Sequence, residues 1–118
     1  MVDDERLLQV LLIAHRTSMR GAGVSPYQAL ADSAYHSLRP HFNVNDLRRV
    51  IDGHPELIDQ WISYSEDKRT TGGWYIQASG STISSLAEGA EIRFGSLADA
   101  VSNYAIQELD FWAAIGPT

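Results

Sequence analysis

The sequence contains no cysteine. This absence excludes disulfide bonds, thiolate zinc sites, iron–sulfur clusters and cysteine nucleophiles, because each of them requires a cysteine sulfur. The redox environment of the protein is left open by this composition, and a cytoplasmic location is the simplest expectation.

Long hydrophobic runs are also missing. The apolar stretch from Leu7 to Ala14 is interrupted by Gln9, and the residues before it are acidic where a secretory signal carries positive charge. No later stretch approaches the roughly 18–20 apolar residues that a membrane span needs. We therefore expect a soluble protein that is neither secreted by this route nor embedded in a membrane.

Positive charge is scarce, most of all in the last part of the chain. The net charge is −6, and after residue 69 a single cation, Arg93, stands against five carboxylates. Proteins bind phosphate backbones and anionic lipid surfaces through positive patches. The charge distribution therefore argues against nucleic acid and membrane surfaces as partners, and it fits either a basic protein partner or a role in solubility alone.

Recognisable motifs for catalysis or cofactor binding are absent as well. The chain has four histidines, and the helix-breaking Pro40 separates His36 from His41, so these two do not share a helix face as a zinc hydrolase would need. There is no Gly-x-Ser-x-Gly elbow, no Walker-type loop and no dinucleotide fingerprint. We therefore predict no metal, no cofactor and no catalytic residue, and the sequence favours a protein that is not an enzyme.

The first part of the chain carries apolar residues at helical spacing. The first apolar stripe follows an acidic first turn and stops at the glycines of residues 21–23. Ser25 and Pro26 supply an N-cap and a first helical residue for the next helix, which Pro40 ends. Two more helices flank the turn at Gly53. Four N-terminal helices are therefore predicted, near residues 4–19, 26–39, 44–52 and 55–67.

The periodicity changes after the paired glycines 72–73. Apolar and polar residues alternate from Trp74 to Ala78, and a second extended run covers residues 83–86. Gly89 then stands where a hairpin loop needs a left-handed residue, before a third extended run at residues 92–94. This pattern predicts a three-stranded antiparallel meander.

A long amphipathic segment closes the chain. Ser96 begins a capping pattern, and apolar residues recur at helical spacing until Gly116. Because a helix and a half-apolar sheet both need a partner layer, this helix is expected to pack on the sheet. The predicted fold is thus a single α+β domain over residues 1–118.

One polar segment stands out where helix is expected to give way to sheet. Residues 65–75 hold the only lysine, an adjacent arginine, carboxylates, hydroxyls and two aromatics. Loops held by rigid elements concentrate binding residues, and arginine, tryptophan and tyrosine are frequent in interaction hot spots. The same residues also fit a plain helix end followed by a buried strand. The predicted ligand- or partner-binding residues are Glu66, Lys68, Arg69, Thr71, Gly72, Gly73, Trp74 and Tyr75.

Together these features favour a non-enzymatic protein-interaction domain. Such a domain would act as a regulator, an inhibitor or an immunity-type partner of another macromolecule. Bacterial immunity proteins against nuclease toxins share this size and charge, although no motif here identifies such a family. A homodimer is predicted if Trp112, near the end of the chain, packs against a second copy.

Two alternatives belong to other functional classes. In a small enzyme or ligand-binding domain, Arg69 would clamp an anionic carboxylate or phosphate, and Trp74 would stack on the ligand. A winged-helix-like DNA binder is the other alternative, because the third and fourth helices flank a short turn and a meander follows them. The fourth helix is rich in carboxylates, however, whereas DNA-reading helices carry basic and amide groups.

Overall fold

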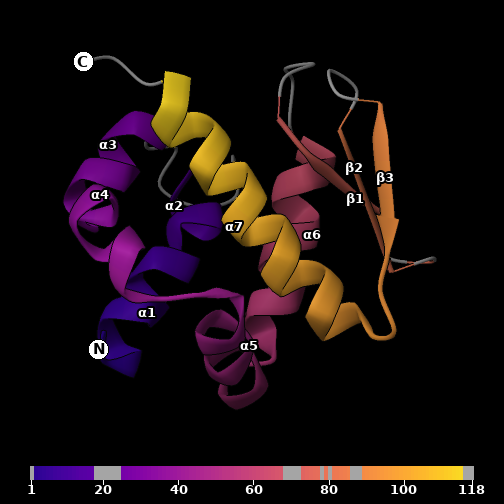
Figure 1. Cartoon of the computed structure of the whole chain (residues 1–118), viewed down its shortest axis with the longest axis horizontal. Helices are drawn as coiled ribbons and strands as arrows, with labels where there is room; N and C mark the ends of the chain where they lie inside the picture. Colours follow the sequence, from indigo (N-terminus) through magenta and orange to yellow (C-terminus); the bar gives the residue numbers. More distant parts are fainter. Residues whose placement is uncertain are drawn as a thin grey trace.

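The computed structural model describes residues 2–17, 25–67, 73–77, 79, 81–85 and 89–115, with the backbone alone at residues 26, 27 and 115. Helices gather on one side, a small sheet lies on the other, and the last helix runs between them (Figure 1). The α+β class, the antiparallel meander and the closing helix on the sheet confirm the sequence prediction. No helix in the described ranges is long and apolar enough to cross a membrane.

The first two predicted helices are each divided into shorter helices. The first is interrupted by a turn at Leu12, and its expected end near residue 19 lies outside the described residues. The second is interrupted at Ala34, whose φ of 57° is left-handed. The apolar spacing continues through both interruptions, so the sequence pattern predicts one helix in each place. The resulting elements are α1 (Asp4–Leu11), α2 (Ile13–Thr17), α3 (Pro26–Asp32), α4 (Tyr35–Leu38) and the 3-10 helix η1 (Arg39–His41).

The helix starts are held by side-chain caps, of which the sequence predicted Ser25 and Ser96. Ser25 and Ser96 each accept a hydrogen bond, at 3.2 Å, from the backbone N–H three residues further on. Asn43 and Asp46 form a reciprocal capping box, with bonds of 3.1 and 2.9 Å. Such caps satisfy N–H groups that have no partner inside the helix. The later helices are α5 (Val44–Gly53), α6 (Glu56–Asp67) and α7 (Leu97–Ile115).

The sheet has the antiparallel order β1-β2-β3. Its strands are β1 (Tyr75–Gln77), β2 (Thr82–Ser85) and β3 (Ala90–Arg93). The register places Ile76 opposite Ile83 and Ile83 opposite Ile92, so the three isoleucines form one row across the sheet. Gly89 has a φ of 65°, the left-handed conformation predicted for the loop before β3.

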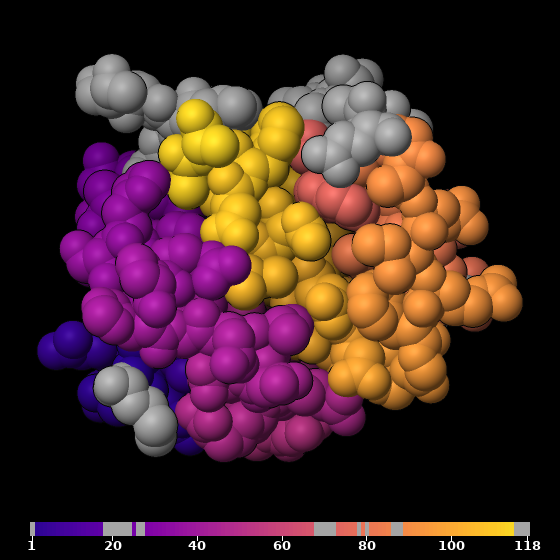
Figure 2. Space-filling view, in the orientation of Figure 1, coloured from indigo at the N-terminus to yellow at the C-terminus, as the bar shows by residue number. Residues whose placement is uncertain are grey.

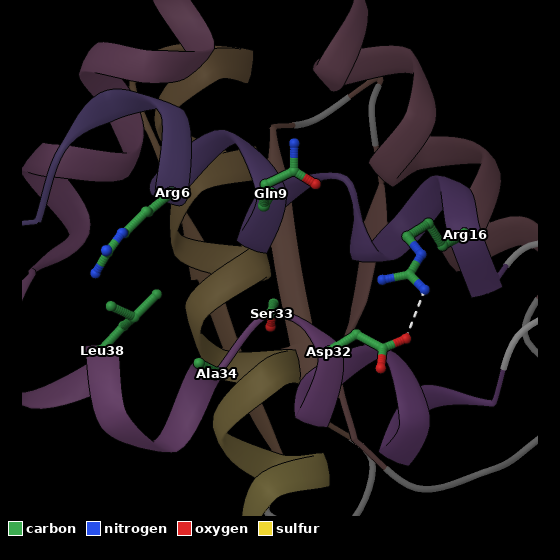
Figure 3. A pocket seen from close by; sticks show the side chains of 7 residues that line it. All are labelled: Arg6, Gln9, Arg16, Asp32, Ser33, Ala34 and Leu38. Atoms are coloured by element: carbon green, nitrogen blue, oxygen red, sulfur yellow. Dashed lines mark hydrogen bonds and ion pairs between the residues drawn. The ribbon is translucent and has the colours of Figure 1, made fainter.

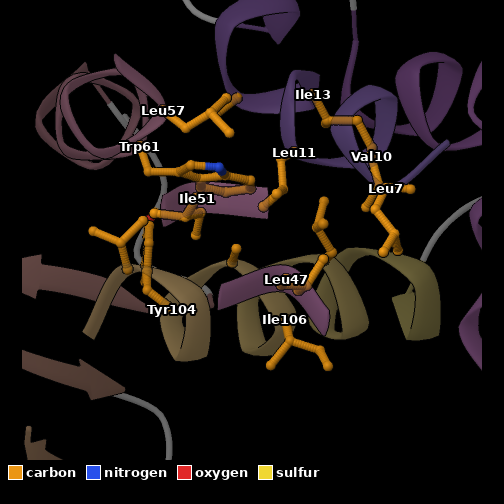
Figure 4. Packing of buried hydrophobic residues seen from close by; sticks show 14 of the residues in the cluster. Leu7, Val10, Leu11, Ile13, Leu47, Ile51, Leu57, Trp61, Tyr104 and Ile106 are labelled. Atoms are coloured by element: carbon orange, nitrogen blue, oxygen red, sulfur yellow. The ribbon is translucent and has the colours of Figure 1, made fainter. Parts of the chain in front are cut away.

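The hydrophobic core lies around α7, which contacts both the helices and the sheet. In the space-filling view, α7 (yellow) separates the magenta helices from the orange sheet (Figure 2). Trp61 of α6 and Tyr104 of α7 are fully buried and meet edge to face, with ring centroids 5.8 Å apart. Leu11 and Ile51 pack in the same cluster (Figure 4). Helices far apart in the sequence therefore share one core with the sheet.

Candidate functional site

The predicted binding segment lies where α6 ends and β1 begins. Glu66 is exposed in the last turn of α6, Gly73 has a left-handed φ of 77°, and Tyr75 is half-buried in β1. Trp74 is 7% exposed, as expected for an aromatic that starts a buried strand. The other predicted residues lie outside the described ranges, namely Lys68, Arg69, Thr71 and Gly72. Within the described part, the segment is therefore anchored in the core through Trp74.

The anchor is a residue that the sequence analysis missed, Glu108 of α7. Its side chain is 0% exposed. One carboxylate oxygen, Oε1, accepts a hydrogen bond from the backbone N–H of Trp74 at 2.8 Å. The other, Oε2, accepts hydrogen bonds from the Tyr64 hydroxyl at 2.7 Å and from Trp112 Nε1–H at 3.0 Å. A single buried carboxylate thus ties α6, α7 and the start of β1 together.

The sequence contained a signal for this anchor. Glu108 lies one helical turn from both Tyr104 and Trp112, on the apolar stripe of its helix. A carboxylate is almost never fully buried unless hydrogen-bonding partners satisfy it, because its desolvation is costly. A lone acidic residue on an otherwise apolar helix stripe therefore indicates a buried polar cluster.

The tyrosines around Glu108 are held in the protonated state. Burial raises the pKa of Tyr64 well above its usual range, and the neighbouring Glu108 carboxylate raises it further. Burial, and next the charge of Glu108, likewise raise the pKa of Tyr104. A protonated Tyr64 hydroxyl can donate its hydrogen bond to Glu108 at neutral pH. Tyr64 is therefore a fixed donor to Glu108, together with Trp112 and the backbone of Trp74.

This arrangement serves to position the chain. Glu108 has no exposed surface, so a ligand cannot reach its carboxylate in this conformation. Beside it, Ser65 Oγ accepts a hydrogen bond from the backbone N–H of Ile76 at 3.1 Å, which fastens β1 to the end of α6 a second time. The two bonds together fix where β1 starts relative to α6 and α7.

Ion pairs neutralise most cations of the described chain. Every described arginine except Arg93 has a carboxylate within ion-pair distance. Arg39 makes a bidentate contact with Asp110, at 2.9 and 3.1 Å, and Arg49 contacts Asp4 at 2.7 Å. Both pairs join elements that are distant in the sequence. These arginines therefore act between elements of the fold and are not presented as a basic patch.

The outward side of α6 carries carboxylates instead. Glu56, Asp59 and Glu66 are all exposed. In the described part of the chain, Asp59 and Glu66 have no ion-pair partner, and Glu56 approaches only His54, at 3.4 Å. Because residues three and seven positions apart share a helix face, the three carboxylates form one acidic stripe.

A groove on the opposite part of the molecule was not predicted. It holds about 370 Å³ and lies between the first two helices and the α3–α4 turn (Figure 3). Arg16 donates a hydrogen bond to Asp32 across it, at 2.7 Å, and Arg6 and Gln9 of α1 line it on the same side as Arg16. The Arg16 guanidinium is thus already paired with a carboxylate, which argues against the groove as a binding site for an anionic ligand.

The described residues offer no group of histidine or carboxylate ligands that could hold a metal ion. No family model matches the chain, and no curated protein and no solved structure matches it.

Proposed function

We propose that this chain is a non-enzymatic protein-interaction domain that binds a basic protein partner, as a regulator, an inhibitor or an immunity-type partner would. The observation that carries the proposal is the acidic stripe of α6, formed by Glu56, Asp59 and Glu66. Its carboxylates are exposed on one helix face, so a single surface of a partner can meet all of them at once.

The distribution of ion pairs supports the proposal. The described arginines other than Arg93 are paired with carboxylates elsewhere, so they do not cancel the field of the α6 stripe. A stripe that no described cation compensates attracts a basic surface and repels acidic ones. This electrostatic complementarity chiefly accelerates association and improves selectivity, and the effect weakens as salt screens the charges.

The alternative of an anionic-ligand site around Arg69 and Trp74 receives less support. The Trp74 side chain is buried, so it has little surface on which a ligand could stack. Its backbone N–H is bound to Glu108, so this donor is not free to hold an anion. The DNA-binding alternative is also disfavoured, because the exposed carboxylates of α6 would repel phosphates.

The experiment removes one charge from the stripe and one from elsewhere. The test variant is Glu66→Gln, and the matched control is Glu5→Gln. Both carboxylates are exposed and lack an ion-pair partner in the described part of the chain, so both variants lose the same charge without breaking a salt bridge. Each protein is immobilised, exposed to lysate of its source organism, and the retained proteins are identified by mass spectrometry.

We expect a basic protein that is retained by the wild type and the control variant but lost from the test variant. With that protein purified, association should slow as salt is raised, and the test variant should show a weaker salt dependence. A wild type that retains no partner, or a partner bound equally by both variants, contradicts the proposal.

A further inference from the structure

The free edge of the sheet combines three features that are otherwise rare in this chain. β3 is an edge strand, since among the strands of the described residues it pairs only with β2. It carries Ile92, whose exposed fraction is 40% and which is the one large hydrophobic residue among the described residues that is exposed. It also carries Arg93, the described arginine without an ion pair, and the exposed Glu91, whose carboxylate likewise has no described partner. An edge strand with unpaired backbone groups is a template for a further strand.

The β2–β3 ladder determines which backbone groups of that edge are free. The N–H of Phe94 donates to the carbonyl of Ser81 at 3.0 Å, so these two residues form a hydrogen-bonded pair. Hydrogen-bonded and non-hydrogen-bonded pairs alternate along an antiparallel ladder. The backbone of Ile92 therefore faces Ile83 of β2, and the N–H and C=O groups of its two neighbours point outward from the sheet.

We propose that two copies of this chain associate through β3, in an antiparallel pairing centred on Ile92. In this register Glu91 of one copy lies opposite Arg93 of the other, and the same pair recurs across the two-fold axis. Each such pair uses backbone N–H and C=O groups that point outward from the monomer. Ile92 meets Ile92 of the second copy on the face toward α7, which continues the isoleucine row across both sheets.

Charge selects this register over the neighbouring ones. A symmetric pairing must place an outward-facing residue opposite another outward-facing residue, and the two such registers next to this one are centred on Glu91 and on Arg93. Centring on Glu91 opposes two carboxylates, and centring on Arg93 opposes two guanidinium groups, both of which are unfavourable cross-strand pairs. Centring on Ile92 opposes unlike charges twice. The strand is thus complementary to itself in one register.

The self-complementarity also identifies the occupant as a second copy. A foreign strand would have to carry an arginine opposite Glu91 and a carboxylate opposite Arg93. A second copy of β3 carries both in these positions. The described strand is four residues long, Ala90–Arg93, and so short an edge provides few contacts. The dimer is therefore expected to be weak, as complexes with small interfaces are, and the dimeric fraction should rise with protein concentration.

The test uses charge reversal in the full-length chain, followed by sedimentation equilibrium from micromolar to millimolar concentrations. Glu91→Arg places arginine opposite arginine at both pairs, and Arg93→Glu places glutamate opposite glutamate. Each single variant should weaken dimerisation by about tenfold or more. Because both positions are exposed on the strand, circular dichroism should show that the variants keep the wild-type fold.

Two rescues distinguish paired strands from a general effect of charge. The double variant Glu91→Arg with Arg93→Glu restores unlike charges within a homodimer and should recover wild-type dimerisation. An equimolar mixture of the two single variants should form a heterodimer, because every opposed pair in it is again of unlike charge. A wild type that stays monomeric at millimolar concentration, or single variants that dimerise like the wild type, overturns the proposal, and so does a failure of both rescues.

Discussion

The carboxylate of Glu108 accepts a hydrogen bond from the backbone N–H of Trp74 at 2.8 Å. This bond joins the last helix to the point where helix gives way to sheet. The two residues are separated by 34 positions in the chain. The strand β1 has only three residues, so its place depends on such anchors more than on its own ladder. The relationship makes the polar cluster around Glu108 a determinant of the fold in this region.

Replacing Glu108 by glutamine should destabilise the protein. The Glu108→Gln side chain has the same shape, but it can present only one carbonyl oxygen, so its NH₂ group must face either the Trp74 N–H or the donors Tyr64 and Trp112. Leaving a buried donor without an acceptor costs about 1–3 kcal/mol, and more where a charged acceptor is lost. Urea unfolding followed by circular dichroism measures the loss. An unchanged midpoint would show that the cluster adjusts without cost.

Two buried tyrosines provide a matched pair. The Tyr64 hydroxyl donates to Glu108 at 2.7 Å, whereas the Tyr104 hydroxyl is buried near Ser65 without a well-formed hydrogen bond in the described structure. Tyr64→Phe should therefore cost about 1–3 kcal/mol, because a donor to a buried carboxylate is lost. Tyr104→Phe should leave the free energy of unfolding unchanged or raise it, since it removes an unsatisfied polar group. Equal losses from both variants would contradict the assignment.

Stability should fall steeply in alkaline solution. Burial raises the pKa of Tyr35, Tyr64 and Tyr104 above the value of an unfolded chain, and the carboxylates of Asp110 and Glu108 add to the effect. Below about pH 10 the three hydroxyls are protonated in both states, so their contribution is complete. Above that pH only the unfolded chain releases the protons, which favours unfolding by about 1.4 kcal/mol per pH unit for each tyrosine.

Urea titrations at a series of alkaline pH values measure this slope. The Tyr104→Phe variant removes one of the three titrating groups, so its slope should be about one third smaller. Its neutral-pH stability serves as the reference, because the substitution removes no well-formed hydrogen bond in the described structure. A slope that is the same in the variant and in the wild type would show that Tyr104 ionises normally in the folded protein.

Local sequence signals predicted the fold well. The caps at Ser25 and Ser96 and the left-handed Gly89 are each predicted from a few neighbouring residues, and the structure confirms them. The change of period after the paired glycines also marked the sheet correctly. Such features are predictable because their energetics depend on the backbone nearby.

Tertiary relationships were not predictable in this way. The contact of Arg49 with Asp4, 45 positions away, decides that this arginine is unavailable to a partner, and no local pattern encodes it. The burial of Glu108 follows from the packing of α6, α7 and β1 together. The availability of the acidic stripe of α6 is likewise a tertiary property, because it depends on which carboxylates the described arginines contact elsewhere.

The left-handed residues allow opposite predictions for one pair of substitutions. Ala34 has a φ of 57°, a conformation that costs a residue with a Cβ about 1–2 kcal/mol. Ala34→Gly removes this cost, but glycine also has more conformational entropy in the unfolded chain. The net effect should be a rise in the free energy of unfolding of up to about 1 kcal/mol. Gly89 has a φ of 65°, and a Cβ built there meets no atom within 4 Å, so Gly89→Ala should destabilise through backbone strain alone, by about 1 kcal/mol. Thermal unfolding of both variants beside the wild type measures the two shifts. Ala34→Gly removes a Cβ from a left-handed residue, whereas Gly89→Ala adds one. Shifts of the same sign would therefore mean that at least one of the two turns changes its backbone conformation in the variant.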